Sequence, residues 1–336
     1  MRILVTGGSG FIGTNYIDLL CKNGHSEFSN VSHQAPRNRE HNKFWEECDL
    51  LDAPRLEKII ENFHPTHVVH LAAKCGLTET RLSAYAANME GVENLLRALE
   101  KCSSVERAVF TSSMLVCRVG YIPNHDTDYQ PSTLYGQSKV RMEQIIRSRP
   151  NLTYAWTIVR PISIWGPWCE EPYRPFFQAI SRGWYFHVGH GHYRKSLGYV
   201  GNTVYQIHKL LMAPVEKVIN KTMYLADHAP TDLHAFAIEA ERALGGKRIR
   251  HIPLAVAKVA AKVGDLAKTV GWHTVPLTSF RLKNILTEYI FDLQPIMEIA
   301  APLPYDLKTG VERTVEWLLS VGAVARGEFS LGQRSS

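Results

Sequence analysis

The chain has 336 residues, of which 45% are hydrophobic and 21% are charged, and its net charge is +6. This length and composition are typical of a globular enzyme with a full hydrophobic core, and they exclude an intrinsically disordered chain. The positive charge forms no long basic block, and no run of about 18 uncharged apolar residues is present, so we expect neither a nucleic-acid partner nor stable membrane insertion.

The six cysteines are scattered along the sequence without a CxxC pair. Their spacing predicts neither a zinc site nor a disulfide framework, and we interpret them as reduced packing residues. Only Met1 and Arg2 precede the first apolar run, which leaves no room for a signal peptide in this sequence. We therefore expect a cytoplasmic protein.

A glycine-rich turn follows the first apolar run and precedes an amphipathic segment. It reads Thr6-Gly7-Gly8-Ser9-Gly10-Phe11-Ile12-Gly13. Glycine allows positive φ and close backbone approach in such a turn, and the amides at the following helix N-terminus then face a pyrophosphate. We predict a dinucleotide site that includes Gly7, Gly10, Phe11, Ile12 and Gly13.

Short apolar runs then alternate with segments of helical periodicity. The predicted strands are Ile3–Thr6, Phe28–Val31, His67–Leu71, Ala108–Thr111 and Trp156–Val159, and the predicted helices are Phe11–Lys22, Pro54–Asn62, Ser83–Cys102 and Ser132–Arg147. This alternation is typical of an α/β fold with a Rossmann-type doubly wound parallel sheet.

After Gly166 and Pro167 the sequence becomes rich in aromatic residues and histidine. We expect residues 1–166 to form the dinucleotide-binding domain, with some return segments such as 197–226. Residues 167–330 are expected to form mainly a smaller C-terminal α/β substrate lobe, and residues 331–336 a flexible tail.

Tyr135 and Lys139 are four residues apart in a predicted helix, so they share one face. An ammonium group near a phenol, together with an oxidised nicotinamide ring, favours the ionised phenol and makes it a usable acid or base. An exposed helical pair is the alternative. Thr111, Ser112 and Ser113 favour the acid/base interpretation, because they end a predicted strand at the edge where parallel sheets bind ligands.

Together these motifs resemble the extended short-chain dehydrogenases/reductases of the nucleotide-sugar epimerase and dehydratase type. The resemblance also rests on Asp49 to Asp52, His70 to Ala73, Asn88 with Gly91 and Asn94, Arg160-Pro161, Gly166-Pro167 and the segment from Pro304 to Trp317. It implies that Ser113 hydrogen-bonds the substrate hydroxyl or ketone, that Tyr135 exchanges its proton, and that Lys139 binds the nicotinamide ribose and tunes Tyr135.

The resemblance further implies dinucleotide contacts from Asp49 and Leu50 at the adenine, from the loop Leu71-Ala72-Ala73, and from Pro161. It implies a homodimer through the helices around residues 88–98 and 135–146. Asn88 is interpreted as a structural helix asparagine in preference to a member of the proton relay.

The strand after the glycine turn lacks the carboxylate that usually selects NAD about 20 positions further on. The stretch reads Asn30-Val31-Ser32-His33-Gln34. Ser32 with Arg37 can accept a 2′-phosphate through charge-assisted hydrogen bonds, which favours NADP over NAD by a small margin. A solvated loop is the alternative and leaves NAD open.

Met114 and Leu115 limit the set of possible reactions. They stand where sugar 4,6-dehydratases of the family carry an Asp-Glu pair. Neither residue can transfer a proton, so a 4,6-dehydratase is disfavoured. The leading hypothesis is a 4-epimerase or 4-ketoreductase of a nucleotide-linked sugar. The alternatives are an oxidoreductase of a non-nucleotide substrate, similar to 3β-hydroxysteroid dehydrogenases, and a non-catalytic dinucleotide-binding protein.

Four residues are candidates for substrate binding in addition to Ser113. Ser163 replaces an asparagine that contacts the sugar-nucleotide phosphate in many epimerases, and Lys195, with Arg194 beside it, stands where the family has a phosphate-binding arginine. Arg281 is a further candidate for the diphosphate. For the three cations, solvated surface residues are an equal alternative.

Two further segments were weighed for other functions. His187, His190 and His192 lack the spacing of a known zinc site, so no metal is predicted and a glycine-rich loop is favoured. The segment 254–270 is a basic amphipathic helix, and packing of its valine face on the lobe is favoured over membrane contact.

Overall fold

The computed structural model describes residues 1–149, 152–246, 248–269, 271 and 277–326. The chain divides into two compact units. Unit 1 comprises Met1–Ile164, Leu197–His228 and Phe291–Pro304, and unit 2 comprises Trp165–Ser196, Ala229–Ile290 and the residues from Tyr305 onward. The tail expected at 331–336 lies outside the described residues.

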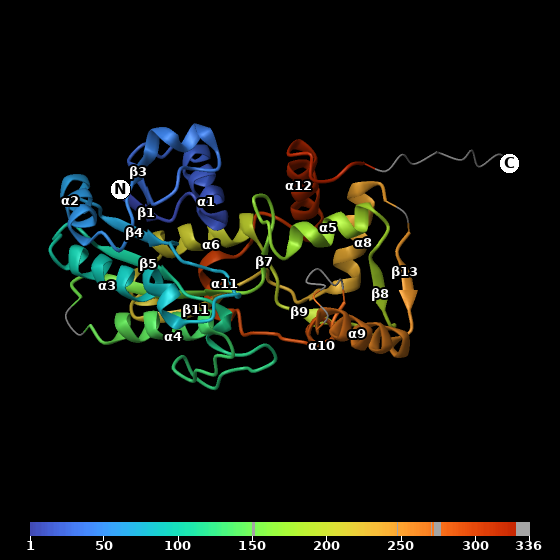
Figure 1. Ribbon diagram of the computed structural model, residues 1–336. Helices are drawn as coiled ribbons and strands as arrows, with labels where there is room; N and C mark the ends of the chain where they lie inside the picture. Colours follow the sequence, from blue (N-terminus) through green and yellow to red (C-terminus); the bar gives the residue numbers. More distant parts are fainter. Residues whose placement is uncertain (150–151, 247, 270, 272–276, 327–336) are drawn as a thin grey trace. The chain divides into compact units, whose positions relative to one another are not determined.

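Unit 1 is built on a seven-stranded parallel sheet with the order β11-β6-β5-β4-β1-β2-β3 (Figure 1). Its order reverses direction at β1, which is the topology of a doubly wound sheet and creates a ligand crevice at the carboxyl ends of the strands. The strands are β1 (Ile3–Thr6), β2 (Phe28–Ser32), β3 (Trp45–Glu47), β4 (His67–His70), β5 (Arg107–Thr111), β6 (Ala155–Pro161) and β11 (Lys221–Leu225).

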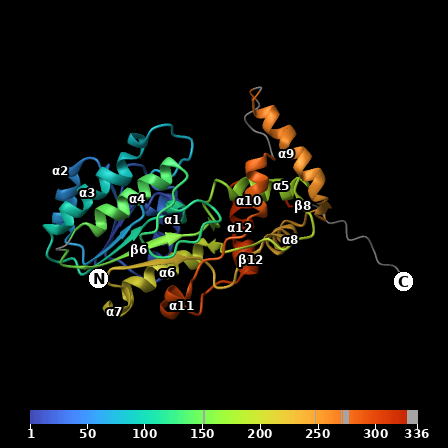
Figure 2. The ribbon, with the colours of Figure 1, turned by 90° about the horizontal axis from the view of Figure 1, so that it is seen from below.

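Helices cover both faces of this sheet (Figure 2). On one face α2 (Ala53–Phe63), α3 (Ala86–Glu100) and α4 (Leu134–Arg147) pack side by side. On the other face α6 (Val200–Met212) packs against α1 (Phe11–Lys22) and α11 (Gln294–Ala300), and the short α7 (Val215–Val218) contacts β6. Residues 291–304 fall in the range expected for the substrate lobe, yet they belong to unit 1 because α11 packs on α6 and β11.

The predicted Rossmann-type sheet is confirmed, and all five predicted strands are present with ends that differ by at most two residues. Each residue of β1 is buried, because helices cover both faces of a parallel sheet and its strands read as continuous apolar runs. Sequence analysis missed β3, an edge strand with the sequence Trp-Glu-Glu. A short, half-exposed edge strand has no continuous apolar run, so the sequence pattern does not reveal it.

A buried ion pair joins α4 to β6 inside unit 1. The Arg160 guanidinium donates to both Glu143 carboxylate oxygens, at 2.9 and 2.8 Å, and both side chains are fully buried. The hydrogen bonds and the charge of Glu143 raise the pKa of Arg160 above its ordinary value. Because an unpaired charge at this depth is costly, the pair fixes how α4 lies on the sheet.

Unit 2 is a smaller assembly of helices and short strands. The helix α8 packs against α5 and α12, and the rings of Trp165, Tyr173 and Phe176 gather around Phe236 of α8. Its elements are α5 (Tyr173–Ser181), β8 (Phe186–Val188), β9 (Arg194–Lys195), β12 (Thr231–Asp232), α8 (Leu233–Leu244), β13 (Arg250–Ile252), α9 (Leu254–Thr269), α10 (Ser279–Leu286) and α12 (Leu307–Ser320). The two-residue strand β10 (Gly198–Tyr199) belongs to unit 1, and β7 (Ile164–Trp165) contains the boundary between the two units.

Candidate active site

The glycine turn lies between β1 and α1, where three backbone segments approach one another. Gly7 has a φ of 76°, and its N–H donates to Val31 O on β2 at 2.8 Å. A β-carbon on Gly7 would lie 2.5 Å from Ala72 Cα, closer than any real side chain approaches backbone. Both the conformation and the crowding therefore require glycine at this position.

The helix α1 begins at Phe11 directly after the turn, and no side chain caps its first amides. A β-carbon on Gly13 would lie 2.2 Å from Gly7 O. The backbone of the helix is therefore in direct contact with the backbone of the turn. Uncapped amides and the positive end of the helix dipole form an anion site. The turn thus brings Gly7, Gly10, Phe11, Ile12 and Gly13 together in a cradle that fits a pyrophosphate.

The loop after β4 passes beside this cradle. Leu71 N donates to Thr6 O at 2.9 Å, and the backbone of Ala72 is the group that excludes a side chain at Gly7. The segment Leu71-Ala72-Ala73 is therefore placed next to the glycine turn, as the predicted dinucleotide contact requires.

The remaining predicted dinucleotide contacts follow the carboxyl ends of other strands. Asp49 comes directly after β3 and Cys48, and its Oδ1 accepts from Leu51 N at 3.0 Å. The Leu50 side chain packs against Gly91 of α3, where a β-carbon would lie 2.9 Å from Leu50 Cβ. Pro161 is the last residue of β6. These residues reach the same edge of the sheet because all seven strands are parallel.

Asn30 also lies against the glycine turn, although sequence analysis did not select it. Its fully buried side chain accepts from Ser32 Oγ at 2.9 Å and donates to Ser9 Oγ at 3.2 Å. A β-carbon on Gly8 would lie 2.4 Å from Asn30 Oδ1. The polar group beside the turn is thus a neutral amide, in a network with the predicted contact Ser32, and Arg37 follows five residues later. The sequence signal that could have identified Asn30 is a polar residue inside the second predicted strand.

The first turn of α4 packs on η3 (Met114–Val116), the short helix that follows β5. Thr133 caps α4 through its hydroxyl, which accepts from Gly136 N at 3.0 Å. A β-carbon on Gly136 would lie 2.2 Å from Leu115 O, so the two backbones are in direct contact. This contact sets the distance between α4 and the end of β5.

That packing brings Tyr135 and Ser113 together. Tyr135 is buried, and a hydrogen bond with the Ser113 hydroxyl lowers its pKa, whereas burial has the larger effect and raises the pKa well above its ordinary value. Ser113 Oγ also accepts from Leu115 N at 3.1 Å, which fixes the hydroxyl. The structure therefore joins two of the three predicted catalytic residues at the carboxyl edge of the sheet.

Lys139, the third, is buried one helical turn further along α4. Its Nζ donates to Thr111 O at 2.9 Å and lies 3.6 Å from Met142 Sδ. Burial lowers its pKa to about 8. The ammonium is thus anchored to the end of β5. Burial has the largest effect on the Tyr135 pKa, and it raises that pKa.

Two hydroxyls beside this group have no hydrogen-bond partner among the described residues. They are Thr111 Oγ1 and Ser112 Oγ, both buried at the end of β5. A buried hydroxyl without a partner is unfavourable. Together with the glycine cradle, these hydroxyls fit an edge that is completed by a polar ligand such as a dinucleotide.

Asn88 on α3 is fully buried and joins two parts of this edge. Its Oδ1 accepts from Lys74 N at 2.8 Å, and its Nδ2 donates to Lys74 O at 3.0 Å and to Ser138 Oγ at 2.9 Å. These bonds tie the loop after β4 to α4. They match the structural interpretation of Asn88.

Cys75, which sequence analysis treated as a packing residue, is exposed and lies beside the catalytic pair. A hydrogen bond with its thiol raises the pKa of Tyr135. Cys75 follows the loop 71–73 by two residues, and no sequence pattern distinguishes it from the other cysteines. Only the folded structure brings it to the phenol.

The predicted substrate residues are divided between the units. Ser163 has a φ of 43°, and its hydroxyl lies 3.9 Å from Met114 Sδ, next to Ser113 in unit 1. In unit 2, Lys195 is buried and donates to Asn284 O, and burial lowers its pKa to about 8. These contacts correct the alternative of a solvated surface residue for Lys195.

The two arginine candidates are exposed. Arg194 forms an ion pair with Glu288 at 3.7 Å. Arg281 lies in the first turn of α10, where its backbone N–H donates to Thr278 Oγ1 at 3.2 Å. Both cations belong to unit 2.

Histidine rings gather in unit 2. The ring centroid of His187 lies 4.2 Å from that of His234 and 4.9 Å from that of His251, and His190 stacks on His251 at 4.9 Å. Across the described ranges, no group of three histidine, cysteine or acidic residues is arranged to hold a metal ion. The rings pack on one another instead.

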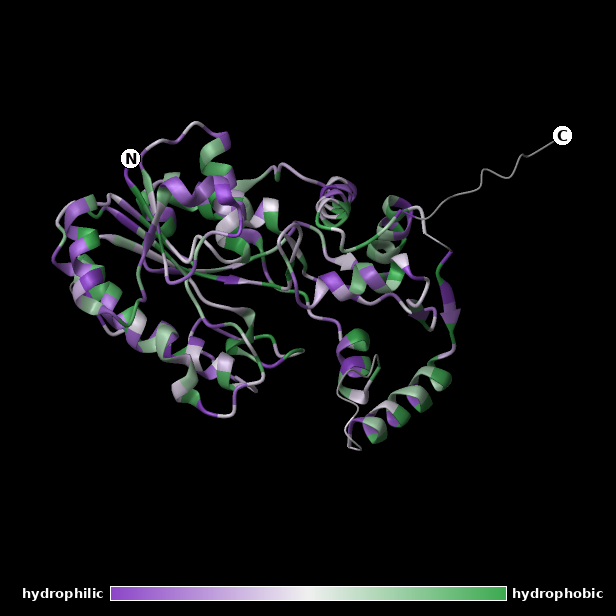
Figure 3. Cartoon of the chain, turned by 45° about the horizontal axis from the view of Figure 1, so that its top comes forward, coloured by the Kyte–Doolittle hydropathy of each residue, from purple (hydrophilic) through white to green (hydrophobic). Residues whose placement is uncertain are grey.

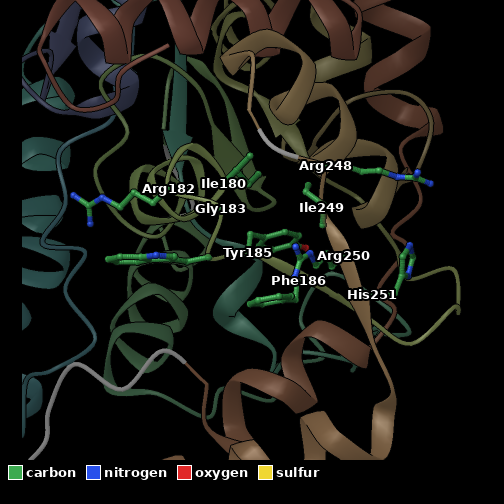
Figure 4. Close-up of a pocket in the computed structure, with 10 residues that line it drawn as sticks. Ile180, Arg182, Gly183, Tyr185, Phe186, Arg248, Ile249, Arg250 and His251 are labelled. Atoms are coloured by element: carbon green, nitrogen blue, oxygen red, sulfur yellow. The ribbon is translucent and has the colours of Figure 1, made fainter. Parts of the chain in front are cut away.

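A pocket of about 740 Å³ opens beside these rings and is shown in Figure 4. Its lining includes Arg182, Arg248 and Arg250 together with the aromatic rings of Tyr185 and Phe186. Figure 4 shows the Arg182 and Arg248 side chains pointing in opposite directions. These two arginines therefore do not converge on one anion in the pocket. None of the predicted site residues lines it.

Residues 3–226 match the NAD-dependent epimerase/dehydratase family. Over 323 residues the chain is 25% identical to the N-acetyl-α-D-glucosaminyl-diphospho-ditrans,octacis-undecaprenol 4-epimerase of Escherichia coli O157:H7, covering 94% of this chain and 95% of that protein. It is 28% identical over 266 residues to a 3β-hydroxysteroid dehydrogenase/Δ5→4-isomerase of Mycobacterium tuberculosis, covering 73% and 70%.

Solved structures share the fold. The UDP-glucose 4-epimerase of Thermotoga maritima, solved with UDP-glucose, has a TM-score of 0.69 at 21% identity and covers 96% of this chain and 99% of its own. The UDP-glucuronic acid 4-epimerase of Bacillus cereus, solved with NAD, has a TM-score of 0.71 at 16% identity, with the same coverage of both chains.

The contact between Cys75 and Tyr135 predicts that a bulky group on this thiol blocks the phenol. Alkylation with N-ethylmaleimide should lower turnover by about 10²-fold or more, because proton exchange at Tyr135 is lost. A Cys75→Ser variant should stay active and resist the reagent, whereas Cys21→Ser, which removes the other exposed cysteine outside the site, should be inactivated like the original chain. Equal inactivation of Cys75→Ser contradicts the placement.

The histidine packing predicts a pH-dependent stability. Burial, with the charges of His234 and His251, lowers the pKa of His187 from 6.5 to about 4. Between these values the unfolded chain binds a proton that the folded chain does not, so the free energy of unfolding falls as the pH drops, by about 2 kcal/mol from this residue.

Urea unfolding at pH 7 and pH 5 measures this difference. A His187→Phe variant should lose less stability on acidification than the original chain, and the change costs no hydrogen bond at Nδ1, which is unpartnered among the described residues. The exposed His228→Gln variant serves as the control. An unchanged pH dependence in His187→Phe is the contrary result.

Proposed function

This chain belongs to the NAD-dependent epimerase/dehydratase family, and we propose that within it the chain is a 4-epimerase of a diphosphate-linked sugar. The observation that carries the proposal is the buried pair of Ser113 and Tyr135, hydrogen-bonded at the sheet edge that also holds the glycine cradle. An oxidoreductase that needs only a hydride carrier and one acid/base matches this set of groups.

The chain's own residues then perform the proton chemistry. A nicotinamide dinucleotide held by the glycine cradle would supply reversible hydride transfer at C4 of the sugar, so no external oxidant would be consumed. Tyr135 receives the proton of the C4 hydroxyl and gives it back to the same oxygen, and Ser113 hydrogen-bonds that oxygen. Lys139, anchored to Thr111 O, holds the ribose, and its charge with that of the oxidised ring offsets the burial that raises the Tyr135 pKa.

Loss of water from the sugar needs a further acid and base beside the hydroxyl of Ser113. The two residues that follow it are Met114, which is buried against Ser163, and Leu115, whose carbonyl faces Gly136. Neither side chain transfers protons. Epimerisation and simple keto reduction remain, and the relatives with diphosphate-linked sugars favour epimerisation.

The substrate class rests on a shared chemical group. The Escherichia coli relative is named for a sugar diphosphate joined to undecaprenol, and a plant relative from Arabidopsis thaliana, 29% identical over 196 residues, is named a UDP-glucuronate 4-epimerase. Both substrates contain a sugar on a diphosphate. We assign Arg281 and Lys195, both in unit 2, as the residues that hold this diphosphate.

The cofactor is a nicotinamide dinucleotide, and we propose that NADP is accepted at least as well as NAD. The group beside the glycine turn is the amide of Asn30, which carries no charge to repel a 2′-phosphate, and Ser32 and Arg37 follow it. We further propose a cytoplasmic homodimer that pairs α3 and α4 with those of a second copy.

The reaction itself is tested by product analysis. We expect the purified protein to convert one member of a panel of UDP-, GDP-, dTDP- and CDP-sugars and of polyprenyl-diphosphate N-acetylhexosamines into its 4-epimer, without net change of cofactor, as resolved by chromatography. Reduction of a sterol or small ketone with net oxidation of the cofactor, or no turnover across the panel, contradicts the proposal.

The role of Tyr135 is tested by removal of its hydroxyl. Tyr135→Phe should lower turnover by about 10²- to 10⁴-fold, because the acid/base is lost, while dinucleotide binding measured by fluorescence titration stays intact. Tyr121→Phe, which removes a phenol that donates to the Asp128 carboxylate, should keep its turnover. Near-normal turnover in Tyr135→Phe removes the assignment.

The cofactor preference is tested at Asn30. Asn30→Asp keeps the size of the side chain and its bond from Ser32, but it adds a negative charge beside the 2′ position. We expect the ratio of NADP to NAD affinity, measured by calorimetry, to fall by about tenfold or more, since like charges placed together are strongly unfavourable. An unchanged ratio shows that Asn30 does not face the 2′ position.

A further inference from the structure

The helix α9 turns its large apolar side chains away from the protein. The face that packs on α10 is made of small residues, with Ala257 and Ala261 fully buried among Val188 and Leu282. The larger side chains lie between 52% and 66% exposed, and they are Val256, Val259, Val263 and Leu266. At about 100° per residue these four fall within an arc of about 80°, so they form one continuous stripe.

This arrangement corrects the prediction that the valine face packs on the lobe. Alanines allow α9 and α10 to approach closely, and the space between them is already filled by Leu282 and Leu286. Val270, which the sequence placed on the same face, lies outside the described residues. Figure 3 shows α9 with hydrophobic and hydrophilic segments along its whole length.

The neighbouring helix adds to the exposed apolar surface. Phe280, at the start of α10, is 72% exposed, the highest value among the large hydrophobic residues described as exposed. Large apolar side chains left exposed on two packed helices are typical of a surface that meets an apolar phase. We call the stripe together with Phe280 the α9–α10 surface.

The net positive charge of the protein lies in the part of the sequence that contains α9 and α10. Residues 247–290 contain eight lysines and arginines against two acidic residues, a net charge of +6. This equals the net charge of the whole chain, so the rest of the sequence is neutral overall. Lys262 and Lys258 lie about 40° and about 80° around α9 from the edge of the stripe, and both are exposed.

We propose that the α9–α10 surface docks on the interface of an anionic lipid bilayer. The stripe enters the boundary between headgroups and acyl chains, and Lys258 and Lys262 meet the anionic headgroups. Such a helix lies in the plane of the interface. Within the described residues no helix has the length and apolar character needed to cross a bilayer, so the contact is peripheral.

A second copy of the chain is the competing occupant of this surface. A two-fold pairing of α9 with itself would place Lys258 and Lys262 of one copy against the same residues of the other. Repulsion between these like charges opposes the association of two copies. In contrast, each of these lysines raises the affinity for an anionic bilayer by about fivefold. The charge pattern therefore favours the lipid.

Docking extends the proposed function in one respect. A protein held at the bilayer meets sugar diphosphates that are joined to a lipid. Its substrate is then a polyprenyl-diphosphate sugar, an assignment that rests on the proposed 4-epimerase activity. The docking itself does not depend on turnover.

Vesicle sedimentation with the full-length chain tests docking. With vesicles of phosphatidylcholine and phosphatidylglycerol at 0.1 M NaCl we expect most of the protein to sediment, and with pure phosphatidylcholine we expect little to sediment. The double variants Val259→Ser/Val263→Ser and Lys258→Glu/Lys262→Glu should each lower the partition coefficient by about tenfold or more. Their exposed positions predict unchanged melting temperatures.

Matched controls lie in unit 1, where Val215→Ser/Ile219→Ser and Lys22→Glu/Lys217→Glu change exposed residues of the same kinds. These controls should sediment like the original chain. Docking is overturned if the original chain ignores anionic vesicles, if both α9 variants bind like the original, or if Val259→Ser/Val263→Ser instead converts a dimer to a monomer in light scattering.

Turnover assays separate the two proposals. The α9 variants should keep turnover of a water-soluble diphosphate-linked sugar, while turnover of a polyprenyl-diphosphate sugar embedded in anionic vesicles should fall by about tenfold. Sedimentation without turnover of any sugar overturns the proposed function alone. Turnover without sedimentation overturns the docking alone.

Discussion

The site depends on close contact between backbones that only glycine permits. Gly7 lies against the backbone of Ala72, and Gly136 lies against the carbonyl of Leu115, each at a separation too small for a β-carbon. The first contact joins the glycine turn to the loop after β4, and the second joins α4 to the end of β5. Together they bring the pyrophosphate cradle and the catalytic pair to one edge of the sheet, which is where a hydride-transfer site must assemble them.

Burial then sets the chemistry of that edge. It raises the pKa of Tyr135 and lowers that of Lys139 to about 8, so both groups resist the charged form when the protein is alone. The hydroxyls of Thr111 and Ser112 are buried without partners in the described part of the chain. A polar ligand gives these two hydroxyls hydrogen-bond partners, and the positive charge of an oxidised nicotinamide ring favours the ionised form of Tyr135. The site is thus organised for a cofactor that takes part in its electrostatics.

Unit 2 contributes a different kind of surface. Its aromatic core around Phe236 and its packed histidine rings account for the unusual composition of the sequence after Gly166. The positive charge of the chain lies in this unit, beside the exposed stripe of α9. Proton exchange at Tyr135 and contact with a lipid surface are therefore assigned to separate parts of the molecule, and each can change without loss of the other.

The sequence by itself determined the parallel sheet, the glycine cradle and the set of Ser113, Tyr135 and Lys139, because strand alternation, a turn and a four-residue spacing are local patterns. Tertiary structure alone decided which groups meet. Asn30 and Cys75 reach the site through strand order and loop path, and the exposed face of α9 follows from the close packing of its alanines on α10. An amphipathic pattern defines two faces of a helix, but only the packing partner determines which face is buried.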